Sequence, residues 1–217
     1  MRRWLIVNPN TDVAVTRWLA EEARRVAGDD VEIVAVNADS GLAAIQTPAD
    51  IDIAARAVAA DVAAHGHASG ALVAAFGDPG VMAARALGLM PIVGLGEAGM
   101  SAAGEGGRRF SILTLGAAMR EPILAKAAAL GLAESLAEVR VLPFSIPEMI
   151  ADREARREEI AAAIRACKGD AVLLGGAPFA GMARALARET GRFVLDGVEA
   201  AVSELLVLGV RFRRDDK

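Results

Sequence analysis

The sequence is poor in several residue types on which common functional sites depend. Among its 217 residues there are one cysteine, two histidines and no tyrosine. A single cysteine excludes both a disulfide framework and a cysteine-rich metal site. We therefore predict that the protein holds no metal, and that its chemistry depends on other residue types.

Charge and hydropathy exclude two further classes of partner. The formal net charge is −4, and acidic and basic residues are mixed along the chain, without the basic patch that is typical of a nucleic-acid interface. Hydrophobic residues make up 54 % of the chain, but no uninterrupted apolar run reaches the ~18 residues of a membrane span. The basic and apolar residues at the N-terminus end at Asn8-Pro9, too early for a signal peptide. We expect a cytoplasmic protein that binds neither nucleic acid nor a membrane.

A pattern of strand, tight loop and helix occurs twice in the chain. In the first copy, the apolar run 71–75 is followed by the loop 76–80 and then by helix-forming residues. The second copy, over 171–186, has the same order and again places Gly and Pro in its loop. The repeat predicts two similar lobes whose matching loops face each other across a cleft that binds a small molecule.

Apolar runs and helix-forming segments alternate along the whole chain. This alternation is typical of parallel βαβ units, so we predict an α/β fold with two pseudo-symmetric lobes, each a mostly parallel, doubly wound sheet flanked by helices. We expect residues 1–97 to form the first lobe, completed by the C-terminal helix 198–217, and residues 98–197 to form the second. The expected strands include 4–7, 31–36, 71–75, 110–114, 138–142 and 193–195, and the expected helices include 50–65, 117–130, 147–167 and 198–208.

The loops at the carboxyl ends of the expected strands are the predicted ligand site, because ligands of doubly wound sheets bind there. This rule selects the loops 8–11, 76–80 and 94–97 as one wall. These loops and the end of the strand 110–114 carry neutral side chains that suit a carboxylate or a cyclic amide. They are Asn8, Asn10, Thr11 and Thr114.

Four acidic residues in these loops are the candidates for acid–base chemistry. Asp196 directly follows a buried strand and is a candidate general base if it is partly desolvated. Asp78 is a second candidate, and it is equally suited to cap the helix that follows it. Glu97 and Glu199 lie in the first turns of helices, where a structural interaction with the helix dipole is favoured over a functional role.

Five short motifs are spread in order over nearly the whole chain. They are Asn-Pro-Asn-Thr at 8–11, Phe-Gly-Asp-Pro-Gly at 76–80, Pro-Ile-Val-Gly-Leu-Gly-Glu-Ala at 91–98, Phe-Ser-Ile-Leu-Thr at 110–114 and Asp-Gly-Val-Glu-Ala at 196–200. With this order and spacing, the chain resembles the hydantoin and allantoin racemase branch of the aspartate/glutamate racemase superfamily. The resemblance implies two α/β lobes, a site in the cleft between them, no cofactor, and homo-oligomers in many members. It also implies a small carboxylate, hydantoin or ureide as the substrate.

The same resemblance implies a mechanism for which this chain lacks the residues. In the family, one cysteine stands immediately before Phe-Gly-Asp-Pro-Gly and another in a Leu-Gly-Cys loop of the second lobe, and the two thiols flank the α-carbon of the substrate. The matching positions here are Ala75 and Gly176, with Gly175 as the alternative register. Cys167 cannot replace them, because it lies on a helix before its strand, at the opposite end of the sheet. The substrate-binding residues that we predict are Asn8, Asn10, Thr11, Phe76, Gly77, Glu97, Thr114, Gly176, Ala177 and Glu199.

Three functions follow from these observations and stay open at this point. The first is a racemase-type isomerase for a small cyclic amide or amino-acid derivative, with carboxylates such as Asp78 and Asp196, or ordered water, in place of the thiols. The second is a different reaction on the same scaffold, catalysed by a decarboxylase, lyase or hydrolase of a small carboxylate or ureide. The third is non-catalytic binding of such a ligand.

Overall fold

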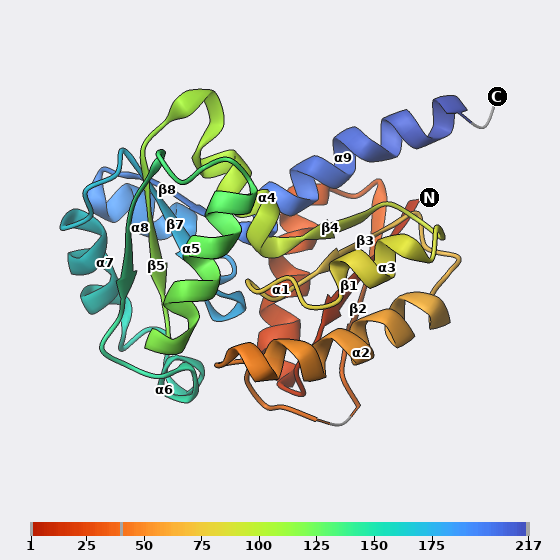
Figure 1. Cartoon of the computed structure of the whole chain (residues 1–217), viewed down its shortest axis with the longest axis horizontal. Coiled ribbons are helices and arrows are strands. Elements are labelled where there is room, and N and C mark those ends of the chain that lie inside the picture. The colour runs from red at the N-terminus through yellow and green to blue at the C-terminus, as the bar shows by residue number, and fades with distance from the viewer. Residues whose placement is uncertain (1, 40, 216–217) are drawn as a thin grey trace.

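Two parallel sheets form the centre of the molecule (Figure 1). The computed structural model describes residues 2–39 and 41–215. The strand order is β2-β1-β3-β4 in the first sheet and β6-β5-β7-β8 in the second, and every neighbouring pair is parallel. The predicted fold class of two pseudo-symmetric α/β lobes is therefore confirmed. The strands are β1 (Arg2–Asn8), β2 (Val31–Asn37), β3 (Gly70–Val73), β4 (Ile92–Gly94), β5 (Phe110–Thr114), β6 (Leu136–Val141), β7 (Ala171–Gly175) and β8 (Phe193–Asp196).

The central strands are apolar because both faces of each sheet are covered. In β1, Trp4 and Ile6 belong to one core cluster and Leu5 and Val7 to another, as expected when successive side chains point to opposite faces. All residues of β3 and β7 are buried. Burial on both faces explains why these strands are continuous apolar runs and do not alternate between polar and apolar residues.

The first helices begin at residues that cap them. The Asp12 carboxylate accepts a hydrogen bond from the backbone N–H of Val15 (2.9 Å), and Thr47 forms a reciprocal capping box with Asp50.

In the described part of the chain, no helix combines the length and the apolar character needed to cross a membrane. The helices are α1 (Val13–Ala27), α2 (Pro48–Ala64), α3 (Val81–Ala86), α4 (Leu95–Ala103), α5 (Arg120–Ala129), α6 (Ile146–Ala151), α7 (Arg157–Arg165), α8 (Ala183–Thr190) and α9 (Gly197–Asp215), with short 3₁₀ helices at Glu105–Gly107, Ala117–Met119 and Ala177–Phe179.

The single long helix predicted over 147–167 is wrong. The structure has two helices in this segment, α6 and α7, separated by residues 152–156. Asp152 ends α6 with a non-helical backbone, and its carboxylate accepts a hydrogen bond from the N–H of Ala155 (2.9 Å), which forms a turn. Charged residues of good helix propensity hide this break in the sequence.

The last helix, α9, lies at the junction of the two lobes. It packs against α1 and α4 and against β3 and β4 of the first sheet, and it extends beyond the expected range 198–208 to Asp215. Figure 1 shows it running from between the lobes along the first lobe. Residues 216–217 of the predicted segment lie outside the described residues. The predicted limit between residues 97 and 98 falls inside α4, so the division into lobes at that point stays a prediction.

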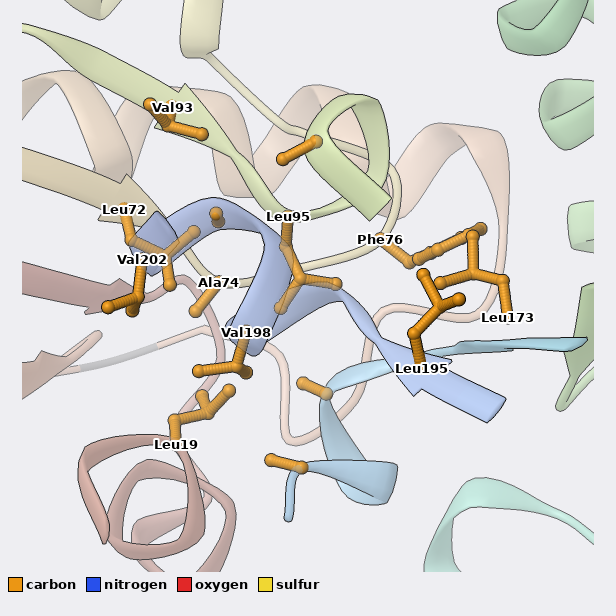
Figure 2. Packing of buried hydrophobic residues seen from close by; sticks show 14 of the residues in the cluster. Leu19, Leu72, Ala74, Phe76, Val93, Leu95, Leu173, Leu195, Val198 and Val202 are labelled. Atoms are coloured by element: carbon orange, nitrogen blue, oxygen red, sulfur yellow. The ribbon is translucent and has the colours of Figure 1, made fainter. Parts of the chain in front are cut away.

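One hydrophobic core cluster includes residues of both lobes. It contains Leu95 of α4 and Phe76 of the loop after β3, together with Leu173 of β7 and Leu195 of β8. Figure 2 shows Phe76 beside Leu173 and Leu195, and Leu95 near Val198 at the start of α9. Because packed interiors resist small shifts, this shared core fixes the lobes relative to each other and fixes the loops between them.

Candidate functional site

A cavity lies where loops of both lobes meet. The first lobe contributes the loops after β1, β2 and β3, and the second contributes the loops after β5 and β7. Because the strands are parallel, these loops follow their carboxyl ends, the edge at which such sheets bind ligands. The cavity brings together six of the predicted substrate-binding residues: Asn10, Phe76, Gly77, Thr114, Gly176 and Ala177.

Apolar side chains from helices form much of the remaining cavity wall, together with Ala44 and Ile45 of the loop after β2. Val15 of α1 lines the cavity, as do Met119 (the N-cap of α5), Ile123 of α5, and Ile146 and Ile150 of α6. The last four form two pairs with a spacing of four residues, so each pair presents one helix face to the cavity. The sequence does not reveal this wall, because an apolar residue that faces a cavity has the same helical spacing as one that faces the core. Among the described residues that line the cavity, none has a charged side chain.

Asn10 offers a hydrogen-bond donor to the cavity. Its Oδ1 accepts hydrogen bonds from Asn8 Nδ2 (3.0 Å) and from the backbone N–H of Asp12 (2.9 Å), which identifies the oxygen end of the amide and leaves Nδ2 for a ligand. Asn8 is fully buried and also donates to Thr16 Oγ1 (2.9 Å), so it orients Asn10 from behind and does not itself line the cavity. Thr11, another predicted ligand contact, also lies outside the lining.

Backbone N–H groups of two cavity loops are further donors. Within the described residues, the N–H groups of Gly77 and Ala177 have no acceptor. The Phe76 oxygen lies against Gly96, where an added Cβ would be 2.1 Å from it. Since the C=O and N–H of a trans peptide point in opposite directions, the N–H of Gly77 points away from α4. The Thr114 hydroxyl donates to the backbone oxygen of the residue at the end of β7 (3.2 Å) and keeps its lone pairs as acceptors.

Ala75 and Gly176, the positions matched to the family cysteines, line the cavity from different lobes. At Gly176 an added Cβ would lie 3.5 Å from its nearest neighbour, Phe179 Cδ2, and the backbone is extended (φ 166°), so a side chain fits there. At Gly175 an added Cβ would lie 2.8 Å from Ile112 Cγ2. Of the two possible registers, Gly176 is therefore the one that accommodates a side chain. Neither Ala75 nor Gly176 can transfer a proton.

Asp78 caps a helix and does not line the cavity. Its buried carboxylate accepts hydrogen bonds from the backbone N–H groups of Gly96 (2.7 Å) and Glu97 (2.8 Å) in the first turn of α4, and it pairs with Lys126 Nζ. Burial raises the pKa of Asp78 to about 6, against the opposing effect of Lys126. Its φ of 51° is a left-handed conformation that costs a non-glycine residue about 1 kcal/mol. The predicted cap of the following helix is wrong, because α3 begins after Gly80 without a side-chain cap and the Asp78 carboxylate binds α4 instead. The catalytic role stays a prediction.

Asp196 has a similar place in the second lobe. Its carboxylate is 1 % exposed and accepts hydrogen bonds from the backbone N–H groups of Gly181 (3.0 Å), Val198 (3.1 Å) and Glu199 (3.0 Å). Burial raises the pKa of Asp196 to about 6, and the nearby carboxylates of Glu22 and Glu199 add to the rise. Asp196 does not line the cavity, so its predicted role as a general base has no direct geometric support.

The remaining candidates lie apart from the cavity. Glu97 accepts a hydrogen bond from the N–H of Gly94 (2.9 Å) and pairs with Arg85, and Glu199 lies 3.5 Å from an Arg25 nitrogen. Both positions support the structural roles that the helix dipole favours. In residues 2–39 and 41–215, no group of three or more His, Cys, Asp or Glu side chains could hold a metal ion.

Comparisons with known proteins agree with one another. A family model described as Asp/Glu/Hydantoin racemase matches residues 5–205. The sequence is 30 % identical over 203 residues to a hydantoin racemase from Pseudomonas sp. (strain NS671), covering 91 % of this chain and 82 % of the relative. The structure is similar to that of an allantoin racemase from Klebsiella pneumoniae, with a TM-score of 0.88 and 32 % identity over 96 % of this chain and 87 % of that one. It is also similar to an allantoin racemase from Pseudomonas fluorescens, with a TM-score of 0.86 and 31 % identity over 97 % of this chain and 91 % of that one.

Proposed function

The chain belongs to the Asp/Glu/hydantoin racemase family, and on this premise we propose that its cavity binds a small cyclic amide or amino-acid derivative with the α-carbon between Ala75 and Gly176. The observation that carries the proposal is that these two residues face one cavity from different lobes. Inversion at a carbon atom requires access to both faces of a planar intermediate, and the two lobes supply the two faces. The proposed activity is therefore of the racemase type.

The lining favours a neutral ring with an apolar substituent. Burying an ionised side chain without a partner is costly, and no described lining residue carries a compensating charge. Ring amide and carbonyl groups of a hydantoin match Asn10 Nδ2, the Thr114 hydroxyl and the loop N–H groups. An alkyl or aryl substituent would pack against Ile123 and Ile150. We therefore expect a 5-substituted hydantoin to bind more tightly than free aspartate or glutamate.

Exchange of the α-proton in this cavity would depend on enolate stabilisation, because the two thiol positions are Ala75 and Gly176. The N–H groups of Gly77 and Ala177 are fixed donors that can stabilise negative charge on a substrate oxygen. Such bonds are stronger in an apolar cavity than in water. Ordered water would then carry the proton, and we expect slow turnover.

The apolar lining also supports decarboxylation as a second candidate. In that reaction the bond between the α-carbon and a carboxylate breaks, its electron pair stays on the α-carbon as an enolate, and CO₂ leaves. The cleavage needs no base, and one proton from water completes the product. Apolar walls such as Ile123 and Ile146 would favour loss of the desolvated carboxylate.

Proton NMR in D₂O tests the proposal. The purified protein is mixed with 5-substituted hydantoins, allantoin, aspartate and glutamate, and the α-proton is followed together with all product signals. We expect loss of the α-proton signal of an apolar hydantoin without a new compound. A protein-free sample at the same pH corrects for spontaneous exchange.

The other outcomes separate the alternatives. New product signals would replace the isomerase proposal by a decarboxylase, lyase or hydrolase. If a ligand stabilises the protein without exchange or turnover, non-catalytic binding would be the function. No effect of any compound in the panel would contradict the proposed ligand class.

Family membership also supports three expectations beyond the site itself. We propose that the protein works without a cofactor, in the cytoplasm, and as a homo-oligomer. Light scattering coupled to size-exclusion chromatography would test the last of these, and a mass equal to that of a single chain at micromolar concentration would contradict it.

A further inference from the structure

A lysine from the second lobe holds a cavity loop of the first lobe. Lys126 lies on α5, and its Nζ donates a hydrogen bond to the backbone oxygen of Gly77 (3.1 Å) and pairs with the Asp78 carboxylate. The Asp78 side chain is 4 % exposed and that of Lys126 is 22 % exposed, so the pair is largely protected from water. Charge-assisted bonds in such surroundings are stronger and less screened than those on the surface.

The same helix also forms part of the cavity wall. Ile123 lines the cavity and lies three residues before Lys126, so both side chains are on one side of α5. The cavity wall of the second lobe and the loop of the first lobe are therefore linked through a single helix turn.

Lys126 helps to hold the peptide groups on both sides of Gly77. Asp78, held by Lys126, accepts hydrogen bonds from the first turn of α4, including one from Gly96 (2.7 Å). The Phe76 oxygen lies against that same Gly96, which turns the peptide N–H of Gly77 away from α4. On the other side of Gly77, its own oxygen is bound by Lys126. The direction of the Gly77 N–H thus depends on two contacts of Lys126, one with the Gly77 oxygen and one with Asp78.

We propose that Lys126 is a positioning residue for the cavity, which holds the loop 75–78 so that the Gly77 N–H faces the ligand. The inference rests on the proposed function in naming the ligand, but the positioning itself is a property of the ligand-free protein. It does not require that Lys126 touch the substrate, and Lys126 does not line the cavity.

The test compares Lys126→Met with Lys126→Arg and with Lys168→Met. Methionine keeps much of the length and removes the charge, arginine keeps the charge, and Lys168 is an exposed lysine outside the cavity lining that serves as the matched control. Hydrogen exchange is measured on peptides that cover residues 75–80 and 95–99 and on a peptide from β7. In Lys126→Met we expect exchange in the first two peptides to be at least ~5-fold faster and exchange in β7 to be unchanged. Lys126→Arg should restore most of the protection.

Ligand affinity gives the second readout. With 5-benzylhydantoin as the probe, Lys126→Met should bind about tenfold more weakly than the wild type, and Lys168→Met should bind equally well. Wild-type protein that does not bind any hydantoin would defeat the proposed function, while the exchange data would still decide the positioning role. Unchanged exchange at residues 75–80 in Lys126→Met would overturn that role, and so would faster exchange in all peptides, which reports general destabilisation.

Discussion

The two loops that meet at the cavity have corresponding places in their lobes but are held in different ways. Each lobe has a buried aspartate that binds the first turn of a helix at the lobe junction. In the first lobe this is Asp78, which lies on the loop after β3 and binds α4. In the second it is Asp196, which ends β8 and binds α9 and the N–H of Gly181. The carboxylate has the same task in both lobes, although it comes from different strand ends.

The strand end of the first lobe that corresponds to Asp196 in the second lobe carries a glycine, Gly94. At Gly94, which ends β4 as Asp196 ends β8, an added Cβ would lie 2.6 Å from the Asp78 Cγ. A side chain at that strand end is therefore incompatible with Asp78 in the first lobe. Of the two aspartates, only Asp78 forms an ion pair with a lysine among the described residues. Asp196 accepts backbone hydrogen bonds, and it interacts through charge with Glu22 and Glu199 and with the guanidinium groups of Arg25 and Arg153. Both lobes thus keep a buried carboxylate at the first turn of a helix, although the aspartate follows a different strand in each lobe.

The largest expected effect comes from restoring thiols to both loops. We expect Ala75→Cys combined with Gly176→Cys to exchange the α-proton of a 5-substituted hydantoin at least ~100-fold faster than the wild type, because acid–base catalysis then acts on both faces. Proton NMR in D₂O measures the rate. Each single variant should gain much less, because one face would still lack a proton carrier.

Gly175→Cys is the matched control for the second loop. Its Cβ would lie 2.8 Å from Ile112 Cγ2 and 3.0 Å from the Leu113 oxygen, so we expect destabilisation and no gain in exchange. A faster rate in Ala75→Cys combined with Gly175→Cys than in the pair with Gly176→Cys would show that the other register matches the family.

Removal of the second buried aspartate should have the next largest effect. Asp196→Ala leaves three backbone N–H groups without their acceptor, so we expect the free energy of unfolding to fall by about 3 kcal/mol. Urea unfolding at pH 7 measures the change. Asp152→Ala, which removes one exposed hydrogen bond from Ala155, is the control and should cost roughly 0.5 kcal/mol. Equal losses in the two variants would contradict the structural role of Asp196.

Much of the fold follows from patterns that are local in the sequence. Apolar runs such as 71–75 and 171–174, each followed by Gly and Pro, predict buried parallel strands, and the family resemblance that rests on the motifs is confirmed. The break in the helix expected over 147–167 could not be predicted, because it depends on a side-chain hydrogen bond of Asp152.

The site was predictable at the loops after β1 and β3. The predicted loop 94–97 does not line the cavity, whereas Ala44 and Ile45 of the loop after β2 and the helical wall do, and these were not predicted. Asn10, Phe76 and Gly77 follow strand ends, and the topology rule alone places them together. Lys126 carries no motif, and its contact with Asp78 joins residues 48 positions apart in different lobes. Whether Asp78 faced the cavity or capped a helix depended on the turn of its loop, which the sequence left open.

Acidity should raise the stability of the wild type relative to a variant in which one of the two buried aspartates is replaced by asparagine. The pKa of each carboxyl is about 6 in the folded protein, above its ordinary value of about 3.9. Because the folded state binds these protons more tightly, their stabilising contribution is complete below about pH 4 and is lost as the pH rises through 6. Relative to Asp196→Asn, which removes one of these groups, the wild type should lose on the order of 2 kcal/mol between pH 4 and pH 7. Urea unfolding at a series of pH values measures this, and parallel curves for the two proteins would disprove the raised pKa of Asp196.

The smallest expected effect concerns the contact that holds the second loop. Arg153, from the turn between α6 and α7, donates to the Ala180 oxygen (2.6 Å), and its guanidinium lies 4.0 Å from the ring centre of Trp18 on α1. It thus connects the lobes beside one loop as Lys126 does beside the other, but through an aromatic ring instead of a carboxylate. We expect Arg153→Met to lower the free energy of unfolding by about 1 kcal/mol, as a partly buried cation–π contact predicts.

The matched control for Arg153 is Arg108→Met, which removes a cation–π contact with Phe193 (4.8 Å) away from the cavity. Both variants should lose similar stability, so stability alone cannot separate them. Hydrogen exchange over residues 176–182 should increase in Arg153→Met only, because the Ala180 oxygen loses its donor there. If both variants left that loop unchanged, the second loop would be held by its own backbone and by Asp196, and the dependence on a cation from another element would be a property of the first loop alone.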